Sequence, residues 1–323
     1  MDILTLWNGL LIHPIMNMTI LAYSLVRDFG FAIIIVTVAI RLALYPLYVT
    51  QIRSQRAMQE VAPAMAELKK KYGKDRQRFS QEQMKLYSER GVNPAAGCLP
   101  LLLQMPLLIA LYNALLQLGC GLGPPPNNEC PGLSYEMVEG FRYSFISNPI
   151  APGGALDTTA NWLPWITRGL QHPDPIFILP VIAGLVQLIA SVMAMPAKQV
   201  QSDDPAARMT QSMAYTFPLI TVVIGAQFPA GLTVYWIATT VFQIVQQYFV
   251  SGWGQLPKYL PFLRGIPTPA DRELHRREQA AIVEARQDMK DQDKEESDER
   301  EPEPATPGRS NGGRRRGRRR GKR

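Results

Sequence analysis

Residues 29–48 read FGFAIIIVTVAIRLALYPLY, an apolar run that contains a single charge, Arg41. About 20 apolar residues, each rising about 1.5 Å along a helix, cross the ~30 Å hydrocarbon core of a bilayer. This run therefore predicts a membrane span. Residues 98–118 and 175–195 form two more apolar runs, both without charge, and predict two more spans.

A longer uncharged stretch covers residues 209–257. Its 49 residues would make a helix of about 73 Å, which is too long for one crossing. Pro229 and Gly231 favour a turn near the middle, so we divide the stretch into spans at 209–228 and 231–250. The sequence thus predicts an all-α, polytopic membrane protein with five transmembrane helices.

The distribution of Lys and Arg predicts the orientation, because loops on the cytoplasmic side are enriched in these residues. Segment 49–97 contains ten of them, segment 119–174 contains two, and the region from residue 251 contains eighteen. We therefore expect 49–97, the short loop 196–208 and the C-terminus in the cytoplasm. Segment 119–174 and the N-terminus are then expected outside a plasma or inner membrane.

Residues 1–28 allow two topologies. Residues 3–26 are uncharged, but Asn8, His13 and Pro14 interrupt the apolar pattern. We interpret 1–28 as a helix that lies in the external membrane interface, and a sixth span stays open as the alternative. The Met-Asp start has no basic stretch ahead of a short apolar core, so no cleaved signal peptide is expected.

Two soluble segments lie between the first three spans. Segment 49–97 predicts a cytoplasmic helical hairpin, with one arm at 51–72 closed by Gly73 and a second at 75–90. A purely structural role and a docking role for this hairpin are both open. In the external loop 119–174, Cys120 and Cys130 predict a disulfide in an oxidising compartment, although the sequence does not show whether their geometry allows it.

The segment 251–323 predicts a basic, disordered cytoplasmic tail, because the last fifty residues contain almost no apolar residues. Residues 271–300 are dense in both signs of charge, and a solvated helix is the alternative there. A block of eight cations at its end would bind polyanions by neutralising phosphates. Ribosomal RNA and anionic lipids are the candidate partners on this side of the membrane, and solubility alone is the alternative. The block consists of Arg314, Arg315, Arg316, Arg318, Arg319, Arg320, Lys322 and Arg323.

Arg41 is the most informative residue, because a cation inside a bilayer costs about 2.5–3.5 kcal/mol on insertion scales. It either extends to the cytoplasmic interface, only a short distance along the helix, or faces a watery cavity. Thr37 lies one turn earlier on the same face, and none of the five spans contains Asp or Glu. An acidic partner from another protein would fit this pattern.

A polar stripe in the last span supports a hydrated groove, with ordinary interhelical hydrogen bonds as the alternative. Its residues recur at intervals of three and four, which places them on one helical face. Gln104 and Gln187 add polar groups from the second and third spans. The stripe consists of Thr233, Trp236, Thr240, Gln243 and Gln247.

Ordered motifs along residues 29–250 resemble the YidC family of membrane protein insertases. They are IIIVTVAIRLALYPL before residue 48, GVNP at 91–94 followed by AAGCLPLLLQMP, the tripeptide ALY at 110–112, and FPAGLTVYW at 228–236. The resemblance implies a positively charged groove that opens to the cytoplasm and to lipid. Within it, Arg41 matches the family's arginine, Thr37 its polar neighbour, and Trp236, with Tyr235 beside it, the aromatic of the last span.

The resemblance further implies an insertase or chaperone that moves nascent membrane proteins into lipid, alone or with the Sec translocon. We expect no cofactor, metal or nucleotide. An enzyme is not expected, because the histidines His13, His172 and His275 lie outside the proposed spans and no nucleophile-elbow pattern occurs. The alternative is a small-solute transporter or channel, and the absence of membrane carboxylates counts against it.

Overall fold

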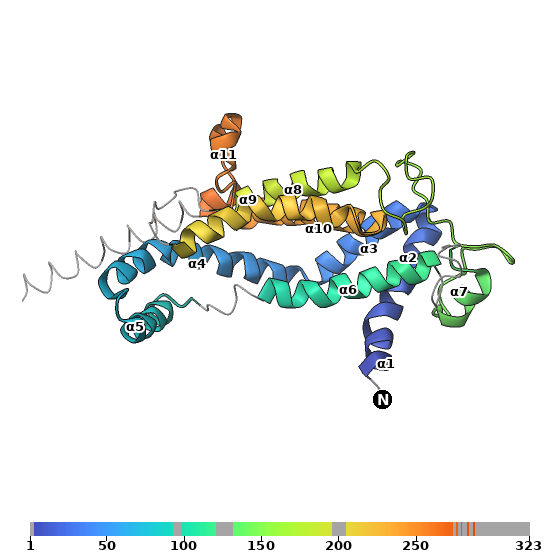
Figure 1. Cartoon of the computed structure of the whole chain (residues 1–323), viewed down its shortest axis with the longest axis horizontal. Coiled ribbons are helices and arrows are strands. Elements are labelled where there is room, and N and C mark those ends of the chain that lie inside the picture. Colours follow the sequence, from blue (N-terminus) through green and yellow to red (C-terminus); the bar gives the residue numbers. More distant parts are fainter. Residues whose placement is uncertain are drawn as a thin grey trace, which may run out of the picture. The chain divides into compact units, whose positions relative to one another are not determined.

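The computed structural model describes residues 3–92, 99–120, 132–195 and 205–273, with four isolated positions beyond them, 276, 279, 283 and 287. It divides into two units, Met1–Arg272 and Glu273–Arg323. The first unit is helical (Figure 1), which confirms the predicted helical class. Within the described residues the only β pairing is an isolated antiparallel bridge between Ser134 and Ala155.

The helices follow one another along the chain with short connections. Their bounds are α1 Ile3–Trp7, the π-helix η1 Asn8–Ile12, α2 His13–Val26, α3 Phe29–Ala43, α4 Tyr45–Tyr72, α5 Arg76–Glu89, α6 Leu99–Cys120, α7 Tyr135–Phe141, α8 Ile178–Ala194, α9 Pro205–Gly225, α10 Ala230–Val250, α11 Leu256–Tyr259 and the 3-10 helix η4 Pro261–Gly265.

Helix α10 is the centre of the bundle, since it contacts α3, α4, α6, α8 and α9. Apolar side chains of α2, α3, α6 and the start of α10 form one core together with segment 132–170. A smaller core forms where the end of α8 meets the chain that follows α10. At Gly184 a side chain would overlap Val222, so this glycine allows α8 and α9 to pack closely.

A buried carboxylate fixes the start of α3. Arg27 ends α2 in the left-handed conformation, with φ 55°, and Asp28 then caps α3. One carboxylate oxygen of Asp28 accepts hydrogen bonds from the backbone N–H of Phe31 at 3.0 Å and from Nε1 of Trp162 at 3.2 Å. The other accepts from the N–H of Asn161 at 2.8 Å. Asp28 therefore joins the helix to the segment predicted to lie outside.

Between α3 and α4 the chain bends by 70° at Leu44. Pro46 explains the bend, because it lacks the N–H that would bond to the carbonyl of residue 42 and its ring crowds that carbonyl. The predicted first span, 29–48, is therefore two helical pieces. Helix α4 continues to Tyr72, and α5 begins after Asp75, whose carboxylate accepts a hydrogen bond from the N–H of Arg78.

One continuous helix in the described part of the chain, Thr5–Val26, is long and apolar enough to cross a membrane, and counting the bent α3–α4 pair as one span gives a second. Three of the other predicted spans appear as shorter apolar helices, Gln104–Cys120, Ile178–Ala194 and Ser212–Gly225. The fifth predicted span, 231–250, corresponds to the 21-residue helix α10. In Figure 1 the α1–η1–α2 helix runs across the direction of the bundle at one end. Five spans and an interfacial N-terminal helix stay predictions.

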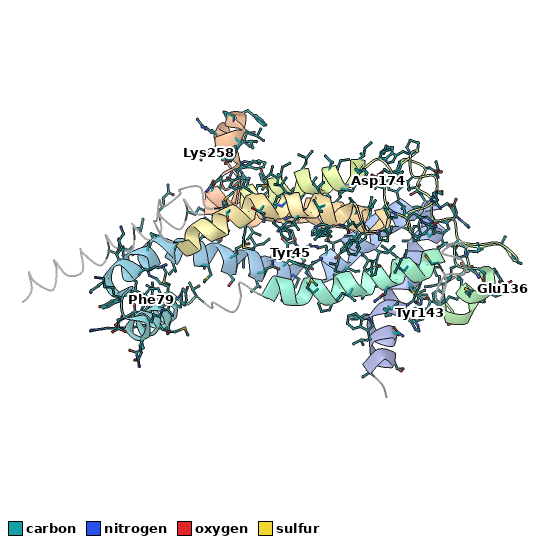
Figure 2. All side chains as sticks on the ribbon, in the orientation of Figure 1. Tyr45, Phe79, Glu136, Tyr143, Asp174 and Lys258 are labelled. Atoms are coloured by element: carbon teal, nitrogen blue, oxygen red, sulfur yellow. The ribbon has the colours of Figure 1, made fainter. Side chains whose placement is uncertain are left out.

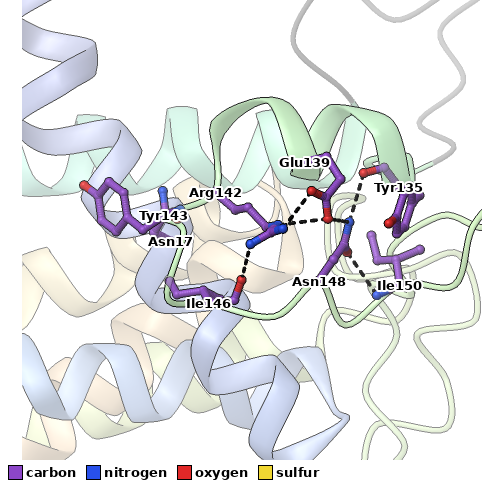
Figure 3. A network of polar contacts seen from close by, with 8 residues as sticks. All are labelled: Asn17, Tyr135, Glu139, Arg142, Tyr143, Ile146, Asn148 and Ile150. Carbon is purple, nitrogen blue, oxygen red and sulfur yellow. Dashed lines mark hydrogen bonds and ion pairs between the residues drawn. The ribbon is translucent and has the colours of Figure 1, made fainter.

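A polar network holds the loop after α7 against α2 (Figure 3). Oδ1 of Asn17 accepts a hydrogen bond from the backbone N–H of Tyr143 at 2.7 Å. Arg142 donates two hydrogen bonds to the carboxylate of Glu139, at 2.8 and 2.9 Å, and Nδ2 of Asn148 donates to the same carboxylate at 3.2 Å. The Arg142 bonds lower the pKa of Glu139 below its ordinary value.

Candidate functional site

Arg41 lies in the last turn of α3 with its side chain in the protein interior, where the residue is only 5% exposed. Its Nε donates a hydrogen bond to Oγ1 of Thr239 in α10 at 3.1 Å. Its guanidinium carbon lies 4.0 Å from the centre of the Tyr48 ring in α4, which is within cation–π range. Three helices therefore surround the cation.

The contacts of Arg41 continue to a fourth helix. Tyr235 lies one turn before Thr239, on the same face of α10. Its hydroxyl accepts a hydrogen bond from Nε2 of Gln104 in α6 at 2.8 Å. Polar groups from α6, α10, α3 and α4 thus form a continuous interior line. We call its five members, Gln104, Tyr235, Thr239, Arg41 and Tyr48, the Arg41 cluster.

No carboxylate pairs with Arg41 among the residues that the structure describes. A guanidinium carries five N–H donors, and only one of them has a hydrogen-bond partner there. Removing a cation from water costs several kcal/mol unless partners replace the lost hydration. The cluster is therefore a positively charged interior site with unused hydrogen-bonding capacity.

Two buried polar side chains, one within the Arg41 cluster and one further along α10, add to this capacity. The Tyr48 hydroxyl and both side-chain amide atoms of Gln246 are buried without a hydrogen-bond partner in the described part of the chain. Gln246 follows Thr239 by two helical turns, which places it on the same face of α10. An unsatisfied buried polar group costs about 1–3 kcal/mol, so this interior would be stabilised by polar molecules that reach it.

The structure places threonines of the predicted stripe away from Arg41. The Thr240 hydroxyl donates to the carbonyl of Trp236 at 2.8 Å and lies 3.5 Å from Oε1 of Gln187 in α8. The Thr233 hydroxyl donates to the carbonyl of Gly225 in α9 at 3.4 Å. These threonines lie on the opposite side of α10 from Tyr235 and Thr239. They therefore join α10 to α8 and α9 instead of facing Arg41.

The remaining predicted site residues occupy different surroundings. Thr37 is buried, and its hydroxyl donates to the carbonyl of Ile33 in its own helix at 2.7 Å. Trp236 and Gln243 are partly exposed. Cys120 is disulfide-bonded at the end of α6, while Cys130 lies outside the described residues, as does the basic block at 314–323.

Sequence reasoning missed Thr239 as a site residue and did not assign Tyr48 to the groove. The sequence could have indicated Thr239, because it follows Tyr235, a predicted groove residue, by four residues. That spacing places the two side chains on the same face of a helix. Tyr48 follows Arg41 by seven residues, which is about two helical turns. Tyr45, which follows the bend at Leu44 and is labelled in Figure 2, is exposed.

A pocket of about 690 Å³ opens at the tip of the α4–α5 hairpin, away from the Arg41 cluster. Cations dominate its lining, and a concave cationic surface attracts anionic partners. Its charged lining residues are Lys69, Lys70, Lys71, Lys74, Asp75 and Arg78.

Large apolar side chains are exposed along α8, α9 and α10, which is typical of helices that face lipid in a helical membrane protein. The family model described as 60Kd inner membrane protein matches residues 21–255, and the chain belongs to this family. The predicted resemblance to the YidC insertase family is thereby confirmed.

Relatives in several bacteria carry the name membrane protein insertase. The YidC insertase of Alkalihalophilus pseudofirmus is 33% identical over 252 residues, which cover 76% of this chain and 81% of the relative. The MisCA insertase of Bacillus subtilis is 30% identical, covering 76% and 79%. The YidC insertase of Histophilus somni is 36% identical over 245 residues, but the chain spans only 37% of that relative's length.

A crystal structure described as an active YidC insertase with its first transmembrane domain resolved is also similar. It is 25% identical to this chain, with a TM-score of 0.46, and the match covers 76% of this chain and 46% of that one.

Proposed function

We propose that this protein inserts the hydrophobic segments and short external tails of nascent membrane proteins from the cytoplasm into the bilayer. The observation that carries the proposal is Arg41, a cation buried among helices without a carboxylate partner in the described residues. A cation in that state attracts an acidic group supplied by a guest protein. Membership in an insertase family supports the same function.

The mechanism separates the polar and apolar parts of the guest. The acidic tail enters a hydrophilic groove at the Arg41 cluster, where polar side chains and water replace hydrocarbon and lower the cost of moving polar groups. The guest's apolar segment then leaves sideways into lipid. Burial of its apolar surface, worth about 25 cal/mol per Å², drives this step. Neither a nucleotide nor a cofactor enters the proposed mechanism.

The proposal includes the topology predicted from the charges: five spans, with the N-terminus outside and the hairpin and C-terminal tail in the cytoplasm. On the cytoplasmic side, the tail would contact ribosomal RNA or anionic lipids, and the hairpin tip offers a second cationic surface. These positions suit reception of a guest directly from the ribosome. Cooperation with the Sec translocon belongs to the same proposal.

The test is insertion of a single-span guest into liposomes that contain the purified protein. Two versions of the guest, with an acidic and with a neutral external tail, are compared on the unmodified protein and on Arg41→Ala. Arg53→Ala serves as the matched control, because it removes an exposed cation from α4. We expect Arg41→Ala to impair the acidic guest more than the neutral one, and Arg53→Ala to impair neither.

Three outcomes would count against the proposal in different ways. Equal impairment of both guests by Arg41→Ala would remove the electrostatic attraction from the mechanism. Insertion unchanged by Arg41→Ala would leave the insertase function and make Arg41 structural. No insertion above empty liposomes by correctly folded protein would overturn the function, and solute uptake by the same liposomes would indicate a transporter or channel.

A further inference from the structure

The chain that follows α10 forms a short segment, residues 256–266, composed of α11 and η4. Leu256 and Leu263 are its anchors, because both are buried in the small core at the end of α8. Gly254 makes the preceding turn with φ 53°, and a side chain there would overlap the carbonyl oxygen of Met193. The 256–266 segment is therefore fixed to the bundle at a defined angle.

The opposite side of this segment is apolar, and the described residues leave it exposed. Phe262 is 69% exposed, and Tyr259, Leu260 and Ile266 are exposed as well. An exposed cluster of large apolar side chains marks a surface that meets another apolar phase. In Figure 1 α11 leaves the direction of the bundle, and Figure 2 places Lys258 on this projecting part.

The outer face of α10 leads directly to this surface. Val241, Val245 and Phe249 are exposed and recur every four residues, so they form one apolar stripe on that helix. In a protein of an inner-membrane family, such a stripe faces lipid. The 256–266 segment begins six residues after α10 ends, and its buried side packs with Ile244 and Tyr248 of α10. The segment is therefore held at the end of the helix that carries the stripe.

Charge identifies the part of the membrane that this surface meets. Lys258 and Arg264 are exposed within the segment. An apolar face flanked by cations is the pattern of elements that lie in the membrane interface, where the cations contact anionic headgroups. We infer that the 256–266 segment lies in the headgroup region of the cytoplasmic leaflet, with Phe262 inserted and the two cations on lipid phosphates.

This inference uses the predicted orientation of α10 but not the insertion activity, so the two can fail separately. The test uses the full chain with Phe262→Cys, labelled with a nitrobenzoxadiazole dye. Cys98, the third cysteine of the sequence beside Cys120 and Cys130, is replaced by serine so that it does not take up the label. Controls carry the dye at Val245→Cys on the lipid-facing stripe or at Ser80→Cys on the exposed surface of α5. The proteins are reconstituted into phosphatidylcholine vesicles, with and without phosphatidylglycerol, that contain a lipid with a nitroxide near the headgroup.

We expect the dye at residue 262 to be quenched by the nitroxide lipid and blue-shifted relative to the dye at residue 80. A depth of about 5–10 Å corresponds to an interfacial element, so the dye at 262 should be shallower than the dye at 245. Because Phe262 is exposed and is not an anchor of the segment, its replacement leaves the packing of Leu256 and Leu263 intact.

A second variant isolates the charge. Lys258→Gln with Arg264→Gln should remove the additional quenching at residue 262 that phosphatidylglycerol produces, while part of the quenching in phosphatidylcholine persists. Quenching at 262 that is no stronger than at residue 80 in either lipid would overturn the inference. A dye that is shielded from water yet not quenched by the lipid would also overturn it, and would indicate that a protein covers this surface.

Discussion

Replacing Thr239 by valine tests the contact that holds Arg41 in the interior. The substitution exchanges the hydroxyl for a methyl group and leaves Nε of Arg41 without its 3.1 Å hydrogen bond. Hydrogen bonds between membrane helices average about 0.6 kcal/mol when measured by double-mutant cycles. Hydrogen bonds to charged groups contribute about 1.5–3 kcal/mol, and the guanidinium places this bond in the second class. We therefore expect the free energy of unfolding to fall by about 1.5–3 kcal/mol.

The assay is reversible unfolding in mixed detergent micelles, followed by circular dichroism, for Arg41→Met, Thr239→Val and the double variant. The coupling energy from this cycle should reach about 1.5 kcal/mol, since removal of either partner already breaks the bond. Thr240→Val is the matched control, because its hydroxyl bonds within α10 and faces α8. Its effect should add to that of Arg41→Met within about 0.5 kcal/mol. Equal coupling of Thr239 and Thr240 to Arg41 would refute the assigned geometry.

Two further predictions concern the end of the bundle that is predicted to lie outside. Asp28→Ala removes a helix cap and leaves two long-range N–H donors without an acceptor. Thermal unfolding should therefore show a free energy of unfolding lower by about 2–4 kcal/mol. A decrease below about 0.5 kcal/mol would contradict the role of this carboxylate. The pKa of Glu139 is lowered in the folded protein. Its contribution to stability should therefore be present above the ordinary carboxyl pKa of about 4.3. It should be lost as the pH falls through the lowered pKa of the folded state. Arg142→Gln should remove this pH dependence of the melting temperature, and an unchanged profile would argue against the Arg142–Glu139 pair as its cause.

The helical class and the family follow from the sequence because they depend on local pattern. Uncharged apolar runs identify helices directly, and Gly73 and Asp75 indicate where α4 ends and α5 begins. The 70° bend at Leu44 was also readable, since Pro46 lies within the apolar run. Identifying spans by hydropathy does not detect the effect of that proline. Hydropathy is averaged over a window of residues and takes no account of backbone hydrogen bonds.

The arrangement of the site was less predictable, because its contacts join residues far apart in the chain. Spacing along α10 places Thr233 and Thr240 on one face, but it does not say which neighbouring helix meets that face. Since helices contact α10 on several sides, the position of a polar residue around α10 does not by itself identify its partner. The contact between Arg41 and Thr239 therefore became visible only in the three-dimensional structure.

The wide separation of Arg41 and Thr239 has a consequence for the biosynthesis of the protein itself. The two residues are 198 positions apart, and synthesis at roughly 5–20 residues per second delays the second by on the order of ten seconds or more. During that interval α3 exists without α10, and its cation lacks the helix that later covers it. A newly made copy thus passes through a stage in which it, like its proposed guests, holds a charged group in the membrane without its final partner.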